Sequence, residues 1–259
     1  MRIFSLVLAA VVTLVTSGAF AQDVLLFEDF NDSTKTYVQT PNIGGTEQTN
    51  SFGSGSDFAY YGRAQAADIP ILDLNGWNGS HFYGAMDTDR ADPPDGQGGG
   101  GVSVPWNPIA LNWTDINIAG YENLEFSGIF GEADTFPTGE SWQDDTSVIV
   151  EAQIDGAGFF QIFGIESGGG TAAPREDTNF DGVGDGTEIF PTMAEFTKSI
   201  AGTGSLLDLR ITINNLTDFQ KDIGFDDITV VGSLIPEPSS IAVLSLIAVG
   251  LFCGRRRRK

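Results

Sequence analysis

Alternating apolar and polar residues recur along the middle of the chain and predict β-strands. Apolar side chains occupy most second positions in residues 123–130, 147–154 and 207–213. Because strand side chains point alternately to the two faces of a sheet, this pattern is typical of strands with one buried face. Helical periodicity does not persist anywhere and shows only weakly at 192–200.

Further apolar runs predict the first and last strands, at 24–30 and 225–231. A glycine-containing turn at 155–158 leads from one alternating run into a second apolar run at 159–165, which predicts a hairpin. Polar, glycine-rich connectors separate the strands. The fold class is therefore predicted to be all-β, a two-sheet sandwich of the jelly-roll type that extends over 22–233 as one domain.

Residues 1–21 have the pattern of a secretory signal peptide. Arg2 supplies the positive charge, residues 3–15 form the apolar core, and Ala19 and Ala21 are the small residues of a cleavage site. An uncleaved membrane helix is the alternative, but the apolar core is short for one. We therefore expect export through the inner membrane and removal of this peptide.

The C-terminal segment 234–259 consists of three blocks with different physical properties. In chain order they are the tripeptide Pro236, Glu237 and Pro238, the apolar run 241–253, and the basic block Arg255, Arg256, Arg257, Arg258 and Lys259. The prolines keep the tripeptide extended and accessible, because proline lacks an N–H and fixes φ. The apolar run would rise about 20 Å as a helix, which is short for a hydrocarbon core of about 30 Å. The basic block would keep its end in the cytoplasm.

This order of blocks resembles the PEP-CTERM sorting signal of Gram-negative, exopolysaccharide-producing bacteria. The resemblance implies that an exosortase-type enzyme recognises the tripeptide 236–238 and cuts near it. It also implies that the apolar run crosses the inner membrane only transiently, and that the four arginines form the stop. The destination would then be the cell surface or the extracellular matrix. The alternative is a C-terminal membrane helix that stays as an anchor.

The exported part is strongly acidic. Six of the 13 basic residues and one of the 35 acidic residues lie in the two terminal segments, which leaves a charge of −27 on the domain between them. This charge argues against nucleic acid as a partner, because nucleic-acid binding needs a basic face. Such self-repulsion also implies that cations offset it. The single cysteine, Cys253, lies in the tail, so the domain is predicted to fold without a disulfide.

The sharpest chemical motif is residues 177–188, which fit D-x-[DN]-x-[DN]-G-x₅-E at all twelve positions. Calcium takes six to eight hard oxygen ligands at about 2.3–2.6 Å, so alternate residues of a tight loop must turn inward. Gly182 would permit the sharp turn. The predicted calcium ligands are the side chains of Asp177, Asn179 and Asp181, the carbonyl of Val183, Asp185 directly or through water, and two oxygens of Glu188.

The loop departs from an EF-hand, because no amphipathic helix flanks it and Gly184 stands at the eighth position. It resembles more closely the calcium loops of thrombospondin type 3 repeats and dockerin-like segments. A calcium ion held there would be structural, and its removal would destabilise the domain. The alternative is an acidic, glycine-rich loop that folds without an ion.

The two ends of the domain carry another resemblance. Residues 25–32 (LLFEDFND) and 224–232 (GFDDITVVG) are similar to the first and last strands of jelly-roll carbohydrate-binding and galactose-binding-like modules. In those families the terminal strands often share a structural calcium. The resemblance implies Glu28 and Asp226 or Asp227 as ligands of a second calcium ion. Solvated acids at strand ends are the alternative.

No catalytic motif stands out. His81 is the only histidine, and the domain has no thiol, no H-E-x-x-H, no G-x-S-x-G and no P-loop. We therefore expect a non-enzymatic structural or interaction protein of the cell surface or exopolysaccharide matrix, stabilised by calcium. The alternatives are a carbohydrate-binding module for extracellular polysaccharide and a glycoside hydrolase or lyase. Exposed Trp or Tyr side chains on one face would favour the carbohydrate-binding module.

Overall fold

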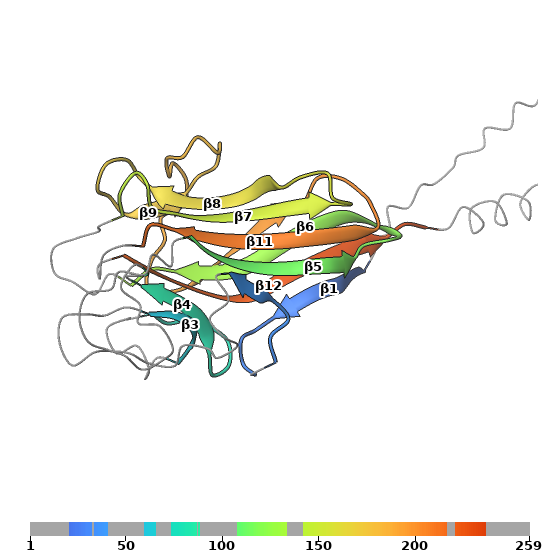
Figure 1. The fold of residues 1–259 in the computed structure, drawn as a ribbon, viewed down its shortest axis with the longest axis horizontal. Coiled ribbons are helices and arrows are strands. Elements are labelled where there is room, and N and C mark those ends of the chain that lie inside the picture. Colours follow the sequence, from blue (N-terminus) through green and yellow to red (C-terminus); the bar gives the residue numbers. More distant parts are fainter. Residues whose placement is uncertain are drawn as a thin grey trace, which may run out of the picture.

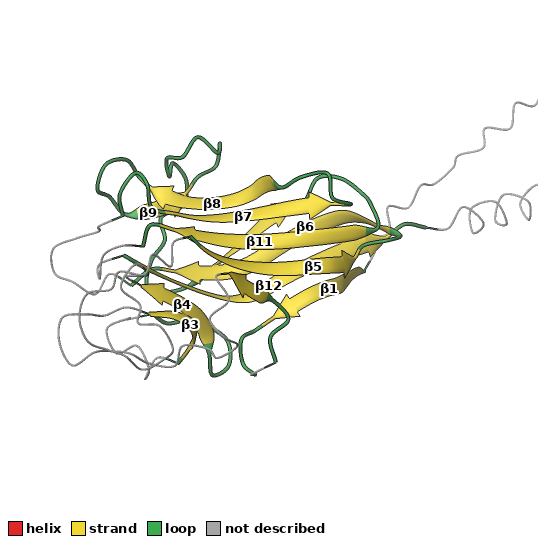
Figure 2. Cartoon of the chain, viewed as in Figure 1, coloured by secondary structure: helices red, strands yellow, loops and turns green. Residues whose placement is uncertain are grey.

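The computed structural model describes residues 21–32, 34–40, 60–65, 74–86, 88, 108–133, 142–216 and 221–236. Within these ranges every regular element is a β-strand (Figure 2). The strands are β1 Gln22–Glu28, β2 Val38–Thr40, β3 Tyr60–Ala64, β4 Phe82–Met86, β5 Ile109–Asn117, β6 Tyr121–Gly131, β7 Ser147–Ile154, β8 Phe160–Ser167, β9 Pro174–Glu176, β10 Ala194–Ser199, β11 Leu206–Asn214 and β12 Asp222–Leu234.

The strands form two antiparallel sheets, which confirms the predicted two-sheet, all-β class (Figure 1). The first sheet has the order β10-β6-β12-β4-β3, and β1 also pairs with β12. The second has the order β2-β5-β11-β7-β8-β9. The thirteen-residue β12 is the centre of the first sheet, because it pairs with β6 along one edge and with β4 and then β1 along the other.

The predicted alternation places its apolar residues between the sheets. In β11, Leu207, Leu209, Ile211 and Ile213 are all buried, and the residues between them are partly exposed. The predicted hairpin is formed by β7 and β8, which pair from Ser147↔Glu166 to Ala152↔Phe160. One continuous core cluster contains side chains from both sheets, so the two layers fold as a single unit.

Two sequence-based expectations differ from the structure or lie beyond it. The weak helical pattern at 192–200 was misleading, since β10 lies there and pairs with β6 at the sheet edge. The described ranges hold no helix long and apolar enough to cross a membrane. The signal peptide up to residue 20 and the sorting segment from residue 237 onward lie outside the described residues.

Candidate functional site

The motif loop 177–188 lies against one edge of the second sheet. β9 leads into it, and an antiparallel bridge between Arg175 and Glu188 closes it. Backbone N–H groups of Asp185 and Gly186 donate to the carbonyl of Glu176, so the loop folds back onto β9. In Figure 1, β9 and this loop lie at the opposite end of the sandwich from the start of β1 and the end of β12.

Asp177 organises the first half of this loop. Its side chain is buried, and its Oδ1 accepts hydrogen bonds from the backbone N–H groups of Asn179 at 3.2 Å and Phe180 at 2.7 Å. Its Oδ2 accepts one from Gly182 at 2.9 Å. Gly182 has φ of +86°, a conformation open to glycine at little cost. The carboxylate therefore curls the loop around itself and keeps one Oδ2 lone pair unused.

The other predicted ligands lie on the exposed side of the loop. Asn179 Oδ1 accepts from the N–H of Asp181, and Asp181 Oδ1 accepts from the N–H of Val183 at 3.1 Å. Asp185 Oδ1 accepts from both the N–H and the hydroxyl of Thr178, and these hydrogen bonds lower the pKa of Asp185. The contacts of Asn179 and Asp181 are Asx-type turns, and together with the Asp185 contacts they leave further carboxylate lone pairs open to an ion.

Glu188, the predicted twelfth-position ligand, is engaged elsewhere. Its Oε2 forms an ion pair with the guanidinium of Arg175. Arg175 also donates to the carbonyl of Gly186 at 3.3 Å. In the part of the chain that the structure describes, no three His, Cys, Asp or Glu side chains are already gathered in a group that could hold a metal ion.

Glu166 is an acid that the sequence patterns did not single out. It stands near the end of β8, and only 7% of its surface is exposed. Burial raises the pKa of Glu166 to about 7, and the negative charge of Asp177 adds to the rise. No sequence signal marked it, since its proximity to the motif loop arises from the pairing of β8 with β9.

The acids of the terminal strands lie where β12 changes partner from β4 to β1. Asp226 is fully buried, and it accepts hydrogen bonds from the N–H groups of Asn78 at 3.0 Å and Asp227 at 2.8 Å. Glu28 accepts instead from the N–H of Phe30 and from the N–H and hydroxyl of Thr36. The Asp227 carboxylate accepts from the side-chain amide of Asn78. Asp226 and Asp227 thus hold the segment at Asn78, whereas Glu28 holds the connection between β1 and β2.

Asp226 is expected to make the folded protein less stable as the pH rises from about 4 to 7. Burial raises its pKa from 3.8 to about 7, and the charges of Asp227 and Asp29 add to the rise. The folded state therefore keeps a proton that the unfolded state releases in this window, and stability is lost as the pH rises. The upper bound is about 4 kcal/mol, and solvent screening reduces our expectation to about 2 kcal/mol.

Urea unfolding of wild type and Asp226→Asn between pH 4 and pH 8, in the presence of EDTA, measures this effect. Asparagine cannot ionise, so we expect the variant to lose less stability across the window than wild type does. Equal slopes for the two proteins would contradict the assignment. Glu166 contributes a slope of the same sign to both proteins, so it cancels in the comparison.

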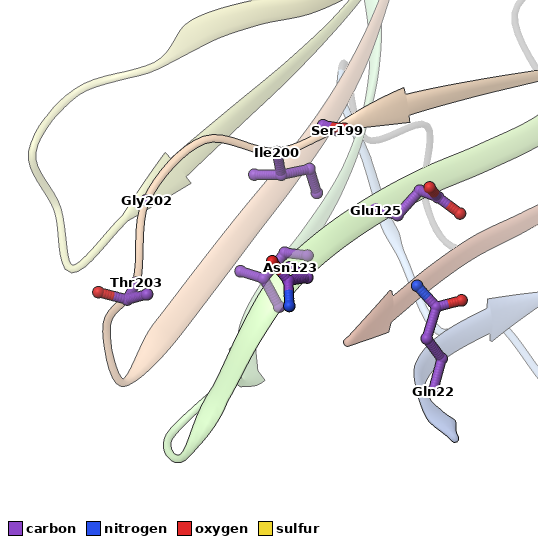
Figure 3. A pocket seen from close by; sticks show the side chains of 8 residues that line it. Gln22, Asn123, Glu125, Ser199, Ile200, Gly202 and Thr203 are labelled. Atoms are coloured by element: carbon purple, nitrogen blue, oxygen red, sulfur yellow. The ribbon is translucent and has the colours of Figure 1, made fainter. Parts of the chain in front are cut away.

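A polar groove lies at the end of the first sheet where the described chain begins and ends. It has a volume of about 430 Å³ and is lined by residues from β1, from β6 and from the segment that ends β10 and follows it. Figure 3 shows the side chains of Gln22, Asn123, Glu125 and Thr203 around it. The lining residues are Gln22, Asn123, Leu124, Glu125, Ser199, Ile200, Gly202 and Thr203.

The described Trp and Tyr side chains do not form an exposed stacking platform. Trp113, Trp142, Tyr37, Tyr61 and Tyr83 are buried in the core, and the other two described ones are half-buried. Trp106 and the side chain of Tyr60 lie outside the described residues. The aromatic signal that would favour sugar stacking is therefore absent from the described surface.

His81 is part of a polar contact network at the start of β4. Its Nδ1 lies 2.6 Å from the Ser80 hydroxyl and 3.1 Å from a guanidinium nitrogen of Arg63. Arg63 also donates to the carbonyl oxygens of Phe30 and Asn31, so the network joins the β1–β2 connection to β3 and β4. These contacts give His81 a structural role, because it helps to hold the β1–β2 connection against β3 and β4.

When the chain is compared with known proteins, it is similar to solved structures but to no family model or curated sequence. The CBM22-1 xylan-binding domain from Paenibacillus barcinonensis Xyn10C aligns with a TM-score of 0.38 and 12% identity over 84% of this chain and 99% of that domain.

Two other structures are similar at the same level. The Clostridium thermocellum endo-1,4-beta-D-xylanase 10B, with CBM22-1 and GH10 modules, aligns at TM-score 0.40 and 10% identity over 81% of this chain and 28% of that longer one. A Stig cyclase, Fisc, from Fischerella sp. TAU aligns at TM-score 0.44 and 11% identity over 83% of this chain and all of that one. Carbohydrate-binding domains are thus among the similar structures, but at TM-scores below 0.5 none of them assigns a ligand to this chain.

Proposed function

We propose that residues 22–233 form an exported, calcium-stabilised sandwich of the jelly-roll type that binds extracellular polysaccharide without converting it. The polar groove beside β6 carries this proposal. Its volume of about 430 Å³ falls within the range of about 300–1,000 Å³ seen for ligand pockets. Amides, hydroxyls and one carboxylate line it, and these groups donate to and accept from sugar hydroxyls.

The chemistry of the groove favours binding over catalysis. Glycoside hydrolysis uses two carboxyl groups on either side of the scissile bond. Among the described lining residues, Glu125 is the one acid. His81 is the sole histidine of the sequence. It precedes β4, contacts Arg63 on β3, and is not among the residues that line the groove. We therefore propose that the groove binds a polysaccharide and does not cleave it.

A structural or interaction protein of the cell surface or matrix is the second candidate. The burial of the described Trp and Tyr side chains favours it, because sugar-binding surfaces commonly stack sugars on such rings. In both cases we propose the same route: a signal peptide at 1–21, then sorting by an exosortase-type enzyme at Pro236–Pro238. The exposure of Leu234, the last residue of β12, and of Ile235 and Pro236 directly after it supports access for such an enzyme.

Binding of the full chain to an array of bacterial and plant polysaccharides tests the groove. We expect at least one polysaccharide without acidic sugars to bind, since the large negative charge of the domain would repel an anionic polymer. We expect Glu125→Ala combined with Thr203→Ala to weaken that binding at least ~10-fold, because two polar contacts are lost. Glu195→Ala, an exposed change on β10 outside the groove, is the matched control.

Two results would count against polysaccharide binding in the groove. The first is that no polymer on the array binds the wild-type chain, which would leave the structural candidate standing. The second is that a polymer binds but the Glu125 and Thr203 changes leave its affinity unchanged, which would move the binding surface elsewhere. Thermal melting of each variant shows whether the fold is intact in either case.

We also propose that loop 177–188 binds calcium. The oxygens of Asp177, Asn179, Asp181 and Asp185 fit a hard divalent cation, because they are carboxylates and an amide on one short curled segment. The Glu188–Arg175 ion pair is the one departure from the predicted ligand set. When bound, the ion would neutralise the loop's negative charge and hold its turns closed, as structural calcium does.

A further inference from the structure

The outer face of β8 brings two carboxylates together beside the motif loop. In the β8–β9 ladder Glu166 pairs with Arg175, and the N–H of Asp177 donates to the carbonyl of Gly164 at 2.9 Å. A Cβ built on Gly164 would lie 3.6 Å from the Cβ of Asp177, so Asp177 projects on the same face as residue 164. Glu166 shares that face, because it stands two residues along the strand.

Both residues are more than nine-tenths buried, but only one of the two carboxylates accepts hydrogen bonds. Asp177 is 1% exposed and accepts three N–H groups, as described above. Glu166 is 7% exposed, and within the described ranges no hydrogen-bond donor or cation pairs with its carboxylate. Its cross-strand neighbour Arg175 is directed to Glu188 and to the carbonyl of Gly186 instead.

A third polar side chain reaches the same place. Gln161 lies over Gly164, since its Nε2 is 2.5 Å from the position that a Cβ on residue 164 would take. That amide nitrogen is buried and has no hydrogen-bond partner. Rotation of the amide exchanges its nitrogen for its oxygen, and the two are not distinguished by shape. Glu166, Gln161 and Asp177 thus lie on one face of β8 around Gly164, and neither the Glu166 carboxylate nor the Gln161 amide nitrogen has a partner among the described residues.

Two buried carboxylates at close range are not stable as ions unless something positive lies between them. A proton on Glu166 is one solution, and a cation is the other. The motif loop adds the hard oxygens of Asn179 and Asp181 on the same segment as Asp177, and a proton on Glu166 does not engage these oxygens. A divalent ion would use all of them, which matches the high coordination number of calcium.

We propose that Glu166, which lies outside the twelve-residue motif, is a ligand of the calcium ion bound by loop 177–188, together with Asp177. This inference rests on the proposed calcium site and adds a strand residue to it. Glu166 takes the place that the motif reserves for Glu188, whose carboxylate is held by Arg175. The ion then joins the loop to β8, so it fastens the loop to the sheet as well as closing its turns.

Calorimetric titration of the full chain with calcium chloride tests the proposal. We expect Glu166→Gln to raise the calcium Kd at least ~10-fold, because glutamine supplies one neutral oxygen in place of a carboxylate. Glu195→Gln, an exposed change on β10, should leave Kd unchanged. An unchanged Kd for Glu166→Gln, with wild type binding calcium, would overturn the role of Glu166 and leave the loop site intact. If the wild type gives no binding heat at 10 mM calcium, the loop site itself fails.

Thermal melting separates ligation from a packing defect. In EDTA we expect Glu166→Gln to melt at the wild-type temperature or above it, because the change removes the repulsion from Asp177. In calcium the order should reverse, since wild type gains more from the ion. A variant that melts below wild type by the same margin in both buffers would show a structural role alone and contradict the proposal.

Discussion

Replacing Phe130 by alanine is expected to lower the free energy of unfolding by about 3–5 kcal/mol, the usual cost of deleting a buried phenylalanine ring. Phe130 is fully buried on β6 and faces the second sheet. Its ring centroid lies 5.1 Å from that of Phe163 on β8, so it joins the two layers. The neighbouring rings on its own sheet are Phe225 at 5.7 Å, Phe196 at 6.2 Å and Phe126 at 6.5 Å.

The loss is expected at the upper part of that range, because four rings would border the cavity and aromatic side chains do not collapse easily into it. Urea unfolding followed by circular dichroism measures the change. Phe190→Ala is the matched control, since that side chain is 56% exposed and should cost less than about 0.5 kcal/mol. A loss below 1 kcal/mol for Phe130→Ala would contradict the packing described for this core.

Calcium is expected to raise the melting temperature of the full chain by about 5–10 °C. Extracellular calcium modules have Kd near 10⁻⁴ M at the tight end of about 10⁻⁴–10⁻³ M. At 10 mM calcium, an ion that binds the folded state alone stabilises it by about 2.7 kcal/mol. A domain of this size shifts by about 2–4 °C per kcal/mol. Differential scanning calorimetry with calcium or with EDTA measures the shift.

The same experiment with Asp181→Ala locates the ion. Asp181 is exposed and accepts a single hydrogen bond from the N–H of Val183, so its removal should hardly affect the ion-free protein. We expect the variant to lose most of the calcium-dependent shift, and Glu195→Ala to keep it. Limited proteolysis should cut within 168–189 faster in EDTA than in calcium. Equal melting temperatures for wild type in both buffers would exclude a stabilising ion.

The parts of the fold that could be predicted are the strands with one face in the core. In β7, for example, Val148, Val150 and Ala152 are buried and Ile149 and Glu151 are not, so the two-residue period is plain in the sequence. β4 could not be recognised in this way, because all five of its residues are buried. Tyr83 and Ala85 face the main core, and Phe82 and Met86 pack in a second cluster.

Edge strands were hidden for the opposite reason. In β10, Phe196 is the one buried residue among six, so no period is visible and the local pattern resembled a weak helix. Its place is fixed by hydrogen bonds to β6 from a distant part of the chain. Local propensity is a weak guide where tertiary pairing decides the conformation.

The candidate sites also differ in whether their residues are close together in the sequence. The motif loop could be found because its oxygens lie within twelve consecutive residues. Glu166 joins it only through the register of β8 and β9, which spacing along the chain does not reveal. The groove is assembled from β1, β6 and the end of β10, so no window of the sequence contains it. Glu166 and the groove could not be predicted, because each depends on contacts between segments that are distant in the sequence.

The pairing of Gln22 with Ser233 means that the polypeptide enters and leaves its folded body through one pole. Were the C-terminal segment left uncut in the bilayer, that pole would face the lipid headgroups, and the groove proposed to bind polysaccharide would be crowded against them. The acidic loop 177–188 at the other pole would face outward into the medium, from which the proposed calcium ion would be taken. Severing the tail would then expose the groove as well as release the protein, and so convert a tethered precursor into a form that polymers can reach.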